Sequence, residues 1–129
     1  DGISVLLVED NEFNVMVARD ELEAAISDIH VDIAGDGQVA VDKVAAHYYD
    51  VILMDIQMPV MNGYDAAKAI RKMNGEKARI PIIAMTANIM KSEVDKCFEA
   101  GMNDFISKPF DSEDLIDRIR KLRIVHNPA

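Results

Sequence analysis

The order of apolar and amphipathic segments is the feature that most restricts the fold of this chain. Short apolar runs alternate with longer stretches in which apolar residues recur at helical spacing. The runs are Ile3–Val8, Val31–Ala34, Val51–Met54, Ile80–Met85 and Phe105–Ile106. Short buried strands separated by helices are typical of βαβ units and a parallel sheet. The pattern therefore predicts an α/β domain of five strands and five helices, and 129 residues fit one such domain spanning residues 1–129.

Helical spacing also predicts which residues of the helices are buried. The expected positions are Val17, Ala18 and Leu22 in the first helix, Val41, Val44, Ala45 and Tyr48 in the helix that Asp36-Gly37 opens, Met90, Val94, Cys97 and Phe98 before Gly101, and Leu115, Ile116, Ile119 and Leu122 in the last helix. Gly101 is expected to end its helix in the left-handed conformation. Asp111 or Ser112 is expected to cap the last helix, with Glu113 and Asp114 in its first turn.

Charge excludes some classes of partner. The chain carries 14 basic and 23 acidic residues, a net charge of −9. Binding to nucleic acid depends on neutralising phosphates with Lys and Arg, so an acidic chain of this kind is not expected to bind it. Direct contact with an anionic membrane surface is not expected for the same reason.

Several features predict a cytoplasmic location. No apolar run approaches the ~20 residues of a membrane span, and no signal peptide is recognisable. Cys97 is the single cysteine, which is expected to be a small buried residue on a helix. The chain begins at Asp1 without Met, so we expect an excised piece of a longer parent protein, which could itself be membrane-anchored.

Chemically distinctive residues follow the predicted strands. Glu9-Asp10 follows the first strand, Asp55 the third, Thr86-Ala87 the fourth and Ser107-Lys108-Pro109 the fifth. In an open parallel sheet, ligands bind beyond the carboxyl ends of the strands. Three carboxylates, one hydroxyl and one ammonium group are therefore expected at one edge of the sheet.

A divalent metal explains why three carboxylates would gather there. Without a cation they would repel one another. Mg²⁺ prefers oxygen ligands and is typically held by one or two carboxylates together with a phosphate. Glu9 and Asp10 are the expected metal ligands, with Mg²⁺ or Mn²⁺ as the ion, and Asp55 can act as both ligand and nucleophile.

A carboxylate that attacks phosphorus forms an aspartyl phosphate, a known type of covalent intermediate. Catalysis of such a transfer rests on positioning and on neutralising the charge of the equatorial oxygens. Lys108, the Thr86 hydroxyl and the Ala87 backbone amide could each contact one of those oxygens. Taken singly, each of these residues also has an ordinary structural role, such as a cap, a strand end or a surface lysine.

The same residues resemble the receiver domains of response regulators. The set Glu9-Asp10, Asp55, Thr86-Ala87 and Lys108-Pro109 matches the family pattern, and the strings MDIQMPVMNGYD, PIIAMTA and GMNDFISKPF extend the match over nearly the whole chain. The resemblance implies a flavodoxin-like (βα)5 three-layer fold, with a five-stranded parallel sheet in the order 2-1-3-4-5 and helices on both faces. It also implies phosphorylation of Asp55 and dependence on Mg²⁺, with the Gln57 backbone carbonyl as a further metal ligand.

The resemblance further implies a switch and a set of partners. Thr86 would move toward the phosphoryl group and Phe105 would change rotamer. Phe105 stands where many relatives carry Tyr, so this chain lacks a hydroxyl there. The style of the motifs is most similar to receivers of hybrid sensor histidine kinases, whose partners are kinase phosphohistidines and histidine-containing phosphotransfer domains. A monomer or weak dimer is expected. The domain would catalyse its own phosphorylation and dephosphorylation without being a conventional enzyme.

Four alternatives remain open at this point. The first is a free-standing or DNA-binding response regulator. The second is a metal-dependent phosphohydrolase of the haloacid-dehalogenase type, which would want a second Asp where Gln57 stands. The third is a flavodoxin-like nucleotide binder, which would need a Gly-, Ser- or Thr-rich phosphate cradle in place of Glu9-Asp10. The fourth is a degenerate receiver that acts only through protein contacts.

The first helix offers a candidate docking surface. Phe13, Val15, Met16, Val17 and Ala18 are nearly consecutive, and a helix turns by 100° per residue, so they cannot all face the core. Some of Phe13, Val15 and Met16 are expected to be exposed beside Asp55, where they could bind the phosphodonor. The alternative is a broad buried face.

Overall fold

The computed structural model describes residues 3–56, 61–86, 90–107 and 112–126, with side chains in the last helix described from Glu113 to Lys121. The elements in chain order are β1 (Ile3–Val8), α1 (Glu12–Ala25), β2 (Ile29–Ala34), α2 (Gly37–Ala46), β3 (Val51–Asp55), α3 (Gly63–Arg71), the 3₁₀ helix η1 (Gly75–Arg79), β4 (Ile82–Thr86), α4 (Lys91–Glu99), β5 (Asp104–Ser107) and α5 (Ser112–His126). None of these helices is long and apolar enough to cross a membrane.

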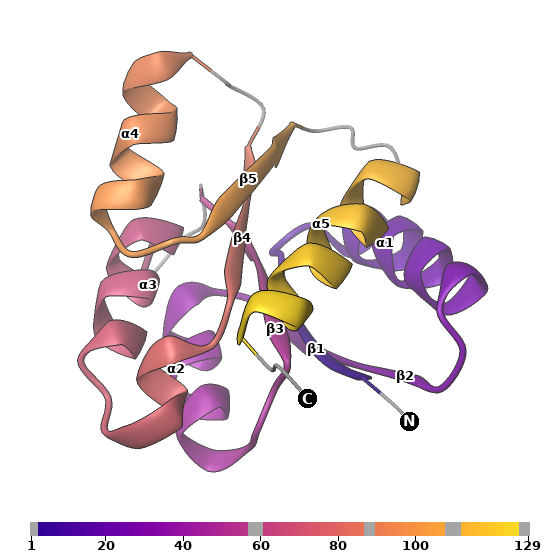
Figure 1. The fold of residues 1–129 in the computed structure, drawn as a ribbon, viewed down its shortest axis with the longest axis horizontal. Helices are drawn as coiled ribbons and strands as arrows, with labels where there is room; N and C mark the ends of the chain where they lie inside the picture. The colour runs from indigo at the N-terminus through magenta and orange to yellow at the C-terminus, as the bar shows by residue number, and fades with distance from the viewer. Residues whose placement is uncertain (1–2, 57–60, 87–89, 108–111, 127–129) are drawn as a thin grey trace.

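The described strands form one parallel sheet in the order β2-β1-β3-β4-β5. Helices α1 and α5 cover one face, while α2, α3 and α4 cover the other (Figure 1). This confirms the flavodoxin-like fold and the strand order that the resemblance implied. The additional helix η1 was not predicted.

Each face of the sheet has its own hydrophobic core because successive side chains of a strand point to opposite faces. On β3, Ile52 and Met54 pack toward α2 and α3, whereas Val51 and Leu53 pack toward α1 and α5. The central strands are therefore apolar almost throughout, which is why their positions could be read from the sequence.

The first three helices begin with Asn or Asp caps. The side chains of Asn11, Asp36 and Asn62 accept hydrogen bonds from the backbone amides three residues later, at 2.9–3.0 Å. These caps fix where each chain segment turns back after leaving a strand. As predicted, Asp36 precedes α2, and Gly101 follows α4 with a φ of 100°.

Several predicted buried positions on the helices are wrong. Ala45 and Tyr48 on or after α2 are exposed, and the buried residues there are Ala40, Val44 and Tyr49. On α4, Met90 and Phe98 are exposed and Val94 is only partly buried, so Cys97 alone matches the prediction of full burial. These helices contact the sheet over a narrower stripe than the apolar pattern indicated.

In α5, Leu115, Ile116 and Ile119 are buried as predicted. The side chain of Leu122 and the proposed cap Asp111 lie outside the described residues. Glu113 and Asp114 lie in the first turn of the helix, where acidic side chains interact favourably with the helix dipole.

Candidate functional site

The carboxyl ends of β1 and β3 bring three carboxylates together. Glu9 and Asp10 directly follow β1, and Asp55 is the last residue of β3. The two strands end side by side, because Val8 pairs with Met54 in the register. One carboxylate oxygen from each of the three residues lies within 4.8 Å of the others. This is the grouping that the positions in the sequence indicated.

Two of these carboxylates are buried. Glu9 is 4% and Asp55 is 6% exposed, whereas Asp10 is open to solvent. The Glu9 amide donates to the Ala34 carbonyl at 3.0 Å, which extends the pairing of β1 with β2, and the Glu9 carboxylate accepts the Asn11 amide at 3.2 Å. Buried negative charge at this density needs a compensating cation. An all-oxygen acidic cluster with one solvent-facing member suits a hard divalent ion that keeps part of its water.

Thr86 lies on the next strand at the same edge of the sheet. It ends β4 and is 7% exposed, and its predecessor Met85 pairs with Asp55. Ser107 at the end of β5 pairs with Thr86. The three remaining predicted contacts of the site, Gln57, Ala87 and Lys108, lie outside the described residues.

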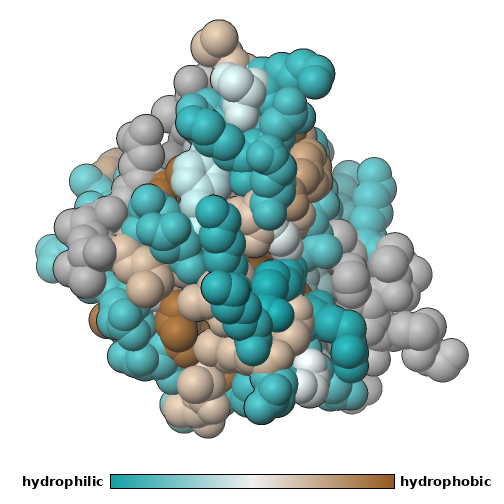
Figure 2. Space-filling view, turned by 90° about the vertical axis from the view of Figure 1, so that its left-hand side faces the viewer, coloured by the Kyte–Doolittle hydropathy of each residue, from teal (hydrophilic) through white to brown (hydrophobic). Residues whose placement is uncertain are grey.

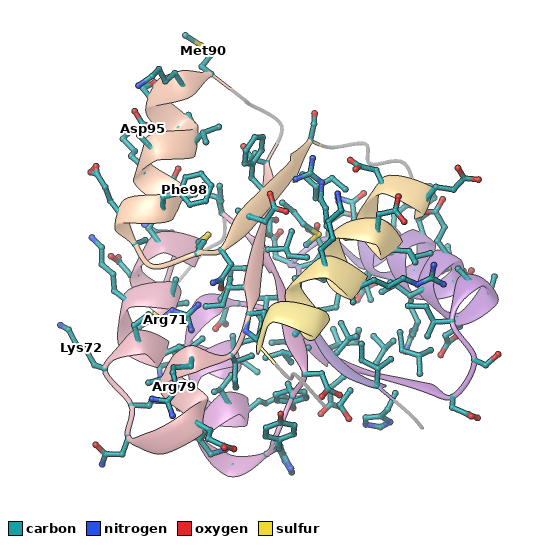
Figure 3. All side chains as sticks on the ribbon, in the orientation of Figure 1. Arg71, Lys72, Arg79, Met90, Asp95 and Phe98 are labelled. Carbon is teal, nitrogen blue, oxygen red and sulfur yellow. The ribbon has the colours of Figure 1, made fainter. Side chains whose placement is uncertain are left out.

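Phe105 lies on β5 between α4 and α5. Its ring meets the Phe98 ring edge-on, with centroids 6.3 Å apart, and the guanidinium carbon of Arg118 lies 5.6 Å from its centroid. Phe98 projects from α4 toward β5 (Figure 3). Arg118 also pairs with Asp104 at 2.5 Å. The ring is thus held from both sides in this conformation, and a change of rotamer stays a prediction.

Helix α1, which begins beside the carboxylates, exposes apolar side chains among polar ones. Phe13 is 66% and Met16 is 50% exposed. Val15 is partly buried and packs against the core beneath α1 and α5. Val17, expected to be buried, is exposed, because the buried stripe runs through Ala18 and Leu22 and Val17 lies a quarter-turn away.

A link between α3 and α4 was not visible in the sequence. The Tyr64 hydroxyl donates to Glu93 Oε2 at 2.6 Å. This bond lowers the pKa of Glu93, while burial, helped by the same bond, raises the pKa of Tyr64. The residues are 29 positions apart, and no sequence pattern links them, so only the fold could reveal the contact. Beside them, burial raises the pKa of the Cys97 thiol, and Cys97 is the small buried residue on a helix expected from the sequence.

Comparison with known proteins assigns this arrangement to a family. Residues 5–120 match the model of the response regulator receiver domain. The chain belongs to this family. A two-component response regulator of rice, ORR41, is 45% identical over 124 residues, which cover 95% of both chains. Hybrid signal transduction histidine kinase G of Dictyostelium discoideum is 39% identical over 97% of this chain, but the match spans 4% of that kinase.

Solved receiver structures have the same fold. The receiver domain of the sensor histidine kinase PA1611 from Pseudomonas aeruginosa, which has a magnesium ion coordinated in its active-site cleft, aligns with a TM-score of 0.87 and 37% identity. The alignment covers 95% of this chain and 98% of that one. The receiver domain of yeast Ssk1, solved in complex with the phosphotransfer protein Ypd1, aligns with a TM-score of 0.87 and 30% identity over 96% and 90% of the two chains. This receiver therefore functions in two-component signalling. The family assignment excludes the phosphohydrolase and nucleotide-binding alternatives.

Proposed function

We propose that this receiver accepts a phosphoryl group on Asp55 from a phosphohistidine. The observation that carries the proposal is the cluster of Glu9, Asp10 and Asp55 at the carboxyl edge of the sheet, with their oxygens within 4.8 Å of one another. Asp55 has the position of a nucleophile. It ends a central strand whose backbone is held by pairing on both sides, so its carboxylate is presented from a rigid support.

The reaction is a direct transfer. An oxygen of Asp55 attacks phosphorus, the bond between phosphorus and the imidazole nitrogen breaks, and that nitrogen leaves with the electron pair. Thr86 lies one strand over and can donate its hydroxyl to the transferred group. Lys108 and the Ala87 amide are proposed to neutralise or bind the other oxygens. We also propose that the switch involves movement of Thr86 and Phe105.

Mg²⁺ is the proposed cofactor, with Mn²⁺ as a substitute. Glu9, Asp10 and Asp55 would hold it, together with the backbone carbonyl of Gln57. Such an ion neutralises charge that develops on the phosphoryl oxygens. Magnesium in the active-site cleft of the PA1611 receiver supports this assignment, as does the oxygen-rich composition of the cluster.

The proposed partners are a kinase phosphohistidine and a histidine-containing phosphotransfer protein. The Ssk1 receiver was solved with such a protein, Ypd1. Phe13 and Met16 on α1 are proposed to contact the donor, because both are exposed apolar residues on the helix that starts next to Glu9 and Asp10. Val15, which packs on the core, is proposed to support this surface rather than to make the contact itself.

For the parent protein we propose a cytoplasmic receiver within a hybrid histidine kinase, as in the Dictyostelium relative. The rice regulator, matched over 95% of its length, favours a free-standing receiver as the second candidate. An immunoblot of the source cells separates them. A band many times larger than 14.3 kDa supports the hybrid kinase, and a band near that mass supports the free-standing regulator.

Phosphotransfer tests the proposal directly. A Ypd1-type protein labelled on its histidine with radioactive phosphate is mixed with wild type or Asp55→Asn in the presence of Mg²⁺. The label should move to the wild type within minutes and not to the variant. Equal labelling of the variant would show that Asp55 is not the acceptor.

A further inference from the structure

Two backbone segments approach each other unusually closely where α2 begins. The Gly37 amide donates to the Met61 carbonyl at 3.1 Å. A Cβ atom added at Gly37 would lie 2.3 Å from that carbonyl oxygen and 3.0 Å from the Met61 Cβ. Side-chain carbons do not come this close to backbone oxygens. Any residue other than glycine at position 37 would therefore push the two segments apart.

Met61 lies two residues before Gly63, the first residue of α3, and the start of α3 lies close to the end of β3. The Gly63 amide donates to the Ile56 carbonyl at 2.8 Å. A Cβ atom at Gly63 would lie 2.4 Å from the Asp55 carbonyl oxygen. The start of α3 thus rests directly on the backbone of Asp55. A displacement at Met61 has little room to be absorbed before it reaches Asp55.

The start of α2 is itself firmly held. Asp36 caps the helix by accepting the Val39 amide at 2.9 Å, and the Asp36 carbonyl accepts the Ala40 amide at 3.1 Å. Ala40 and Val44 of the same helix are fully buried against the sheet. Because these contacts hold α2 against the sheet, a side chain at position 37 would displace mainly Met61.

We propose that Gly37 is a positioning residue for the phosphoryl-acceptor site, acting through Met61 and the start of α3 on the backbone of Asp55. The inference rests on the proposed function of Asp55. It gives α2, which supplies no predicted site residue, a part in setting the position of the Asp55 carboxylate relative to Glu9 and Asp10. Displacements of about 1 Å in the positions of reacting groups can reduce rates by about a hundredfold.

The chain contains a matched control. Gly35 lies two residues earlier, and a Cβ atom there would meet nothing within 4 Å. Neither glycine has a positive φ, so alanine is conformationally acceptable at both positions. The two variants therefore differ in one respect: the new methyl group of Gly37→Ala would collide with Met61, whereas that of Gly35→Ala would meet no neighbour.

The experiment compares both variants with the wild type in Mg²⁺ affinity, in the rate of phosphorylation by acetyl phosphate at saturating Mg²⁺, and in urea stability. We expect Gly37→Ala to lose about tenfold or more in rate, with weaker Mg²⁺ binding, and Gly35→Ala to stay within about twofold of the wild type. A Gly37→Ala protein that is less stable but keeps wild-type affinity and rate would overturn the inference, because its glycine would serve packing alone.

Hydrogen exchange of the wild type provides a second test that does not depend on folding of the variant. If the contact between Gly37 and Met61 supports the metal site, Mg²⁺ should slow exchange of the Gly37 amide several-fold more than that of the Ala40 amide in the same helix. Equal effects on the two amides would count against the inference.

The failure of the inference and the failure of the proposed function can be told apart. A wild type that neither binds Mg²⁺ nor becomes phosphorylated would overturn the proposed function as well. An active wild type with an equally active Gly37→Ala variant would overturn the positioning role alone.

Discussion

A polar contact joins Tyr49, which precedes β3, to Asp32 on the outer strand β2. The buried Tyr49 donates its hydroxyl to Asp32 Oδ2 at 2.6 Å. This bond, followed by the charge of Lys43, lowers the pKa of Asp32 below its ordinary value of 3.8, although partial burial opposes the change. Because the pKa of the folded state is depressed, the stabilisation is present above about pH 3.8 and is lost as the pH falls through the lowered value.

Replacing Tyr49 with Phe tests this contact. Asp32 should titrate at a higher pH in Tyr49→Phe than in the wild type, as followed by NMR of its carboxyl carbon. The free energy of unfolding should fall by about 1 kcal/mol at neutral pH, since Asp32 is partly exposed and hydrogen bonds of this kind contribute modestly. The difference in free energy of unfolding between the wild type and Tyr49→Phe should narrow below pH 3.8. An unchanged titration of Asp32 would mean that the hydroxyl does not stabilise its charge.

The same tyrosine marks a limit of sequence reasoning at the residue scale. Tyr48 and Tyr49 are adjacent, and helical spacing favoured Tyr48 as the buried one. Helix α2 ends at Ala46, however, so the chain beyond it no longer follows helical periodicity. The clustering of Asp55, Glu9 and Asp10 could be predicted because each carboxylate directly follows or ends a buried strand, whereas Tyr64 and Glu93 carry no such signal.

Arg71 at the end of α3 joins several elements at the opposite edge of the sheet from Asp55. Its guanidinium group donates to the carbonyls of Gly101, Ala78 and Ile80 and to the Asn103 side chain, at 2.8–3.0 Å. Figure 3 labels Arg71 with its neighbours Lys72 and Arg79. Burial lowers the pKa of Arg71, so these acceptors are what keep its charge favourable inside the protein.

Substitution of Arg71 should therefore weaken the whole region. Arg71→Met is expected to lower the free energy of unfolding by about 3 kcal/mol, because three carbonyls and the Asn103 side chain each lose a donor. Arg71→Lys should recover little of the lost stability, since an ammonium group cannot reproduce the planar arrangement of donors in a guanidinium group. Urea unfolding measures both. The exposed neighbour serves as the control, and Lys72→Ala should change stability by less than about 0.5 kcal/mol.

Helix α1 carries the second prediction at the scale of elements. If its exposed apolar residues contact the phosphodonor, Phe13→Ala and Met16→Ala should slow transfer from a phosphorylated Ypd1-type protein by about tenfold each, a loss typical of interface residues. Phosphorylation by acetyl phosphate, which needs no docking surface, should be unchanged.

Tyr48 provides the matched control for this surface. It is 60% exposed, close to the 66% of Phe13, but it follows α2 on the other face of the sheet. The outer surface on that side is mainly hydrophilic with smaller apolar areas among the polar residues (Figure 2). Tyr48→Ala should leave both reactions unaffected. If it slowed protein-dependent transfer as much as Phe13→Ala, the donor would not be docking on α1.

Sequence patterns predicted the elements better than the faces of the helices. The central strands β1, β3 and β4 were recognised because both of their sides are almost entirely apolar. The observed ends of all five strands differ from the predicted ends by no more than two residues. The burial of Val17, Met90 and Phe98 was misjudged because periodicity shows which residues could face the core but not how wide the contact is. The helix η1 has no apolar pattern, since its residues are polar or small and it is held partly by Arg71.

At the scale of the whole molecule, the proposed metal site predicts that stability depends on divalent metal, because three carboxylates gather at one edge of the sheet. Mg²⁺ that binds only the folded state stabilises it, by about 1.4 kcal/mol at ten times the dissociation constant. Thermal unfolding of the wild type should therefore shift upward with Mg²⁺. Asp10→Asn should be more stable than the wild type without metal, because like charges are removed, and should gain less from Mg²⁺.

Asp20→Asn on α1 is the control for this prediction, because it removes an exposed carboxylate that is not part of the cluster. It should respond to Mg²⁺ as the wild type does. If Asp10→Asn also responded like the wild type, the three carboxylates would not be the metal site.

The strand order 2-1-3-4-5 also belongs to the scale of the whole molecule. It was predicted from the family resemblance, since alternation of strands and helices alone is compatible with other orders.

The most direct test of the account is phosphorylation of the isolated domain by acetyl phosphate. Wild type and Asp55→Asn are incubated with acetyl phosphate, with and without Mg²⁺, and the intact proteins are weighed by mass spectrometry. The account predicts an added mass of one phosphoryl group on the wild type only, and only with Mg²⁺. A phosphoryl adduct on Asp55→Asn, or one on the wild type that forms equally well when a chelator removes all divalent metal, would contradict it.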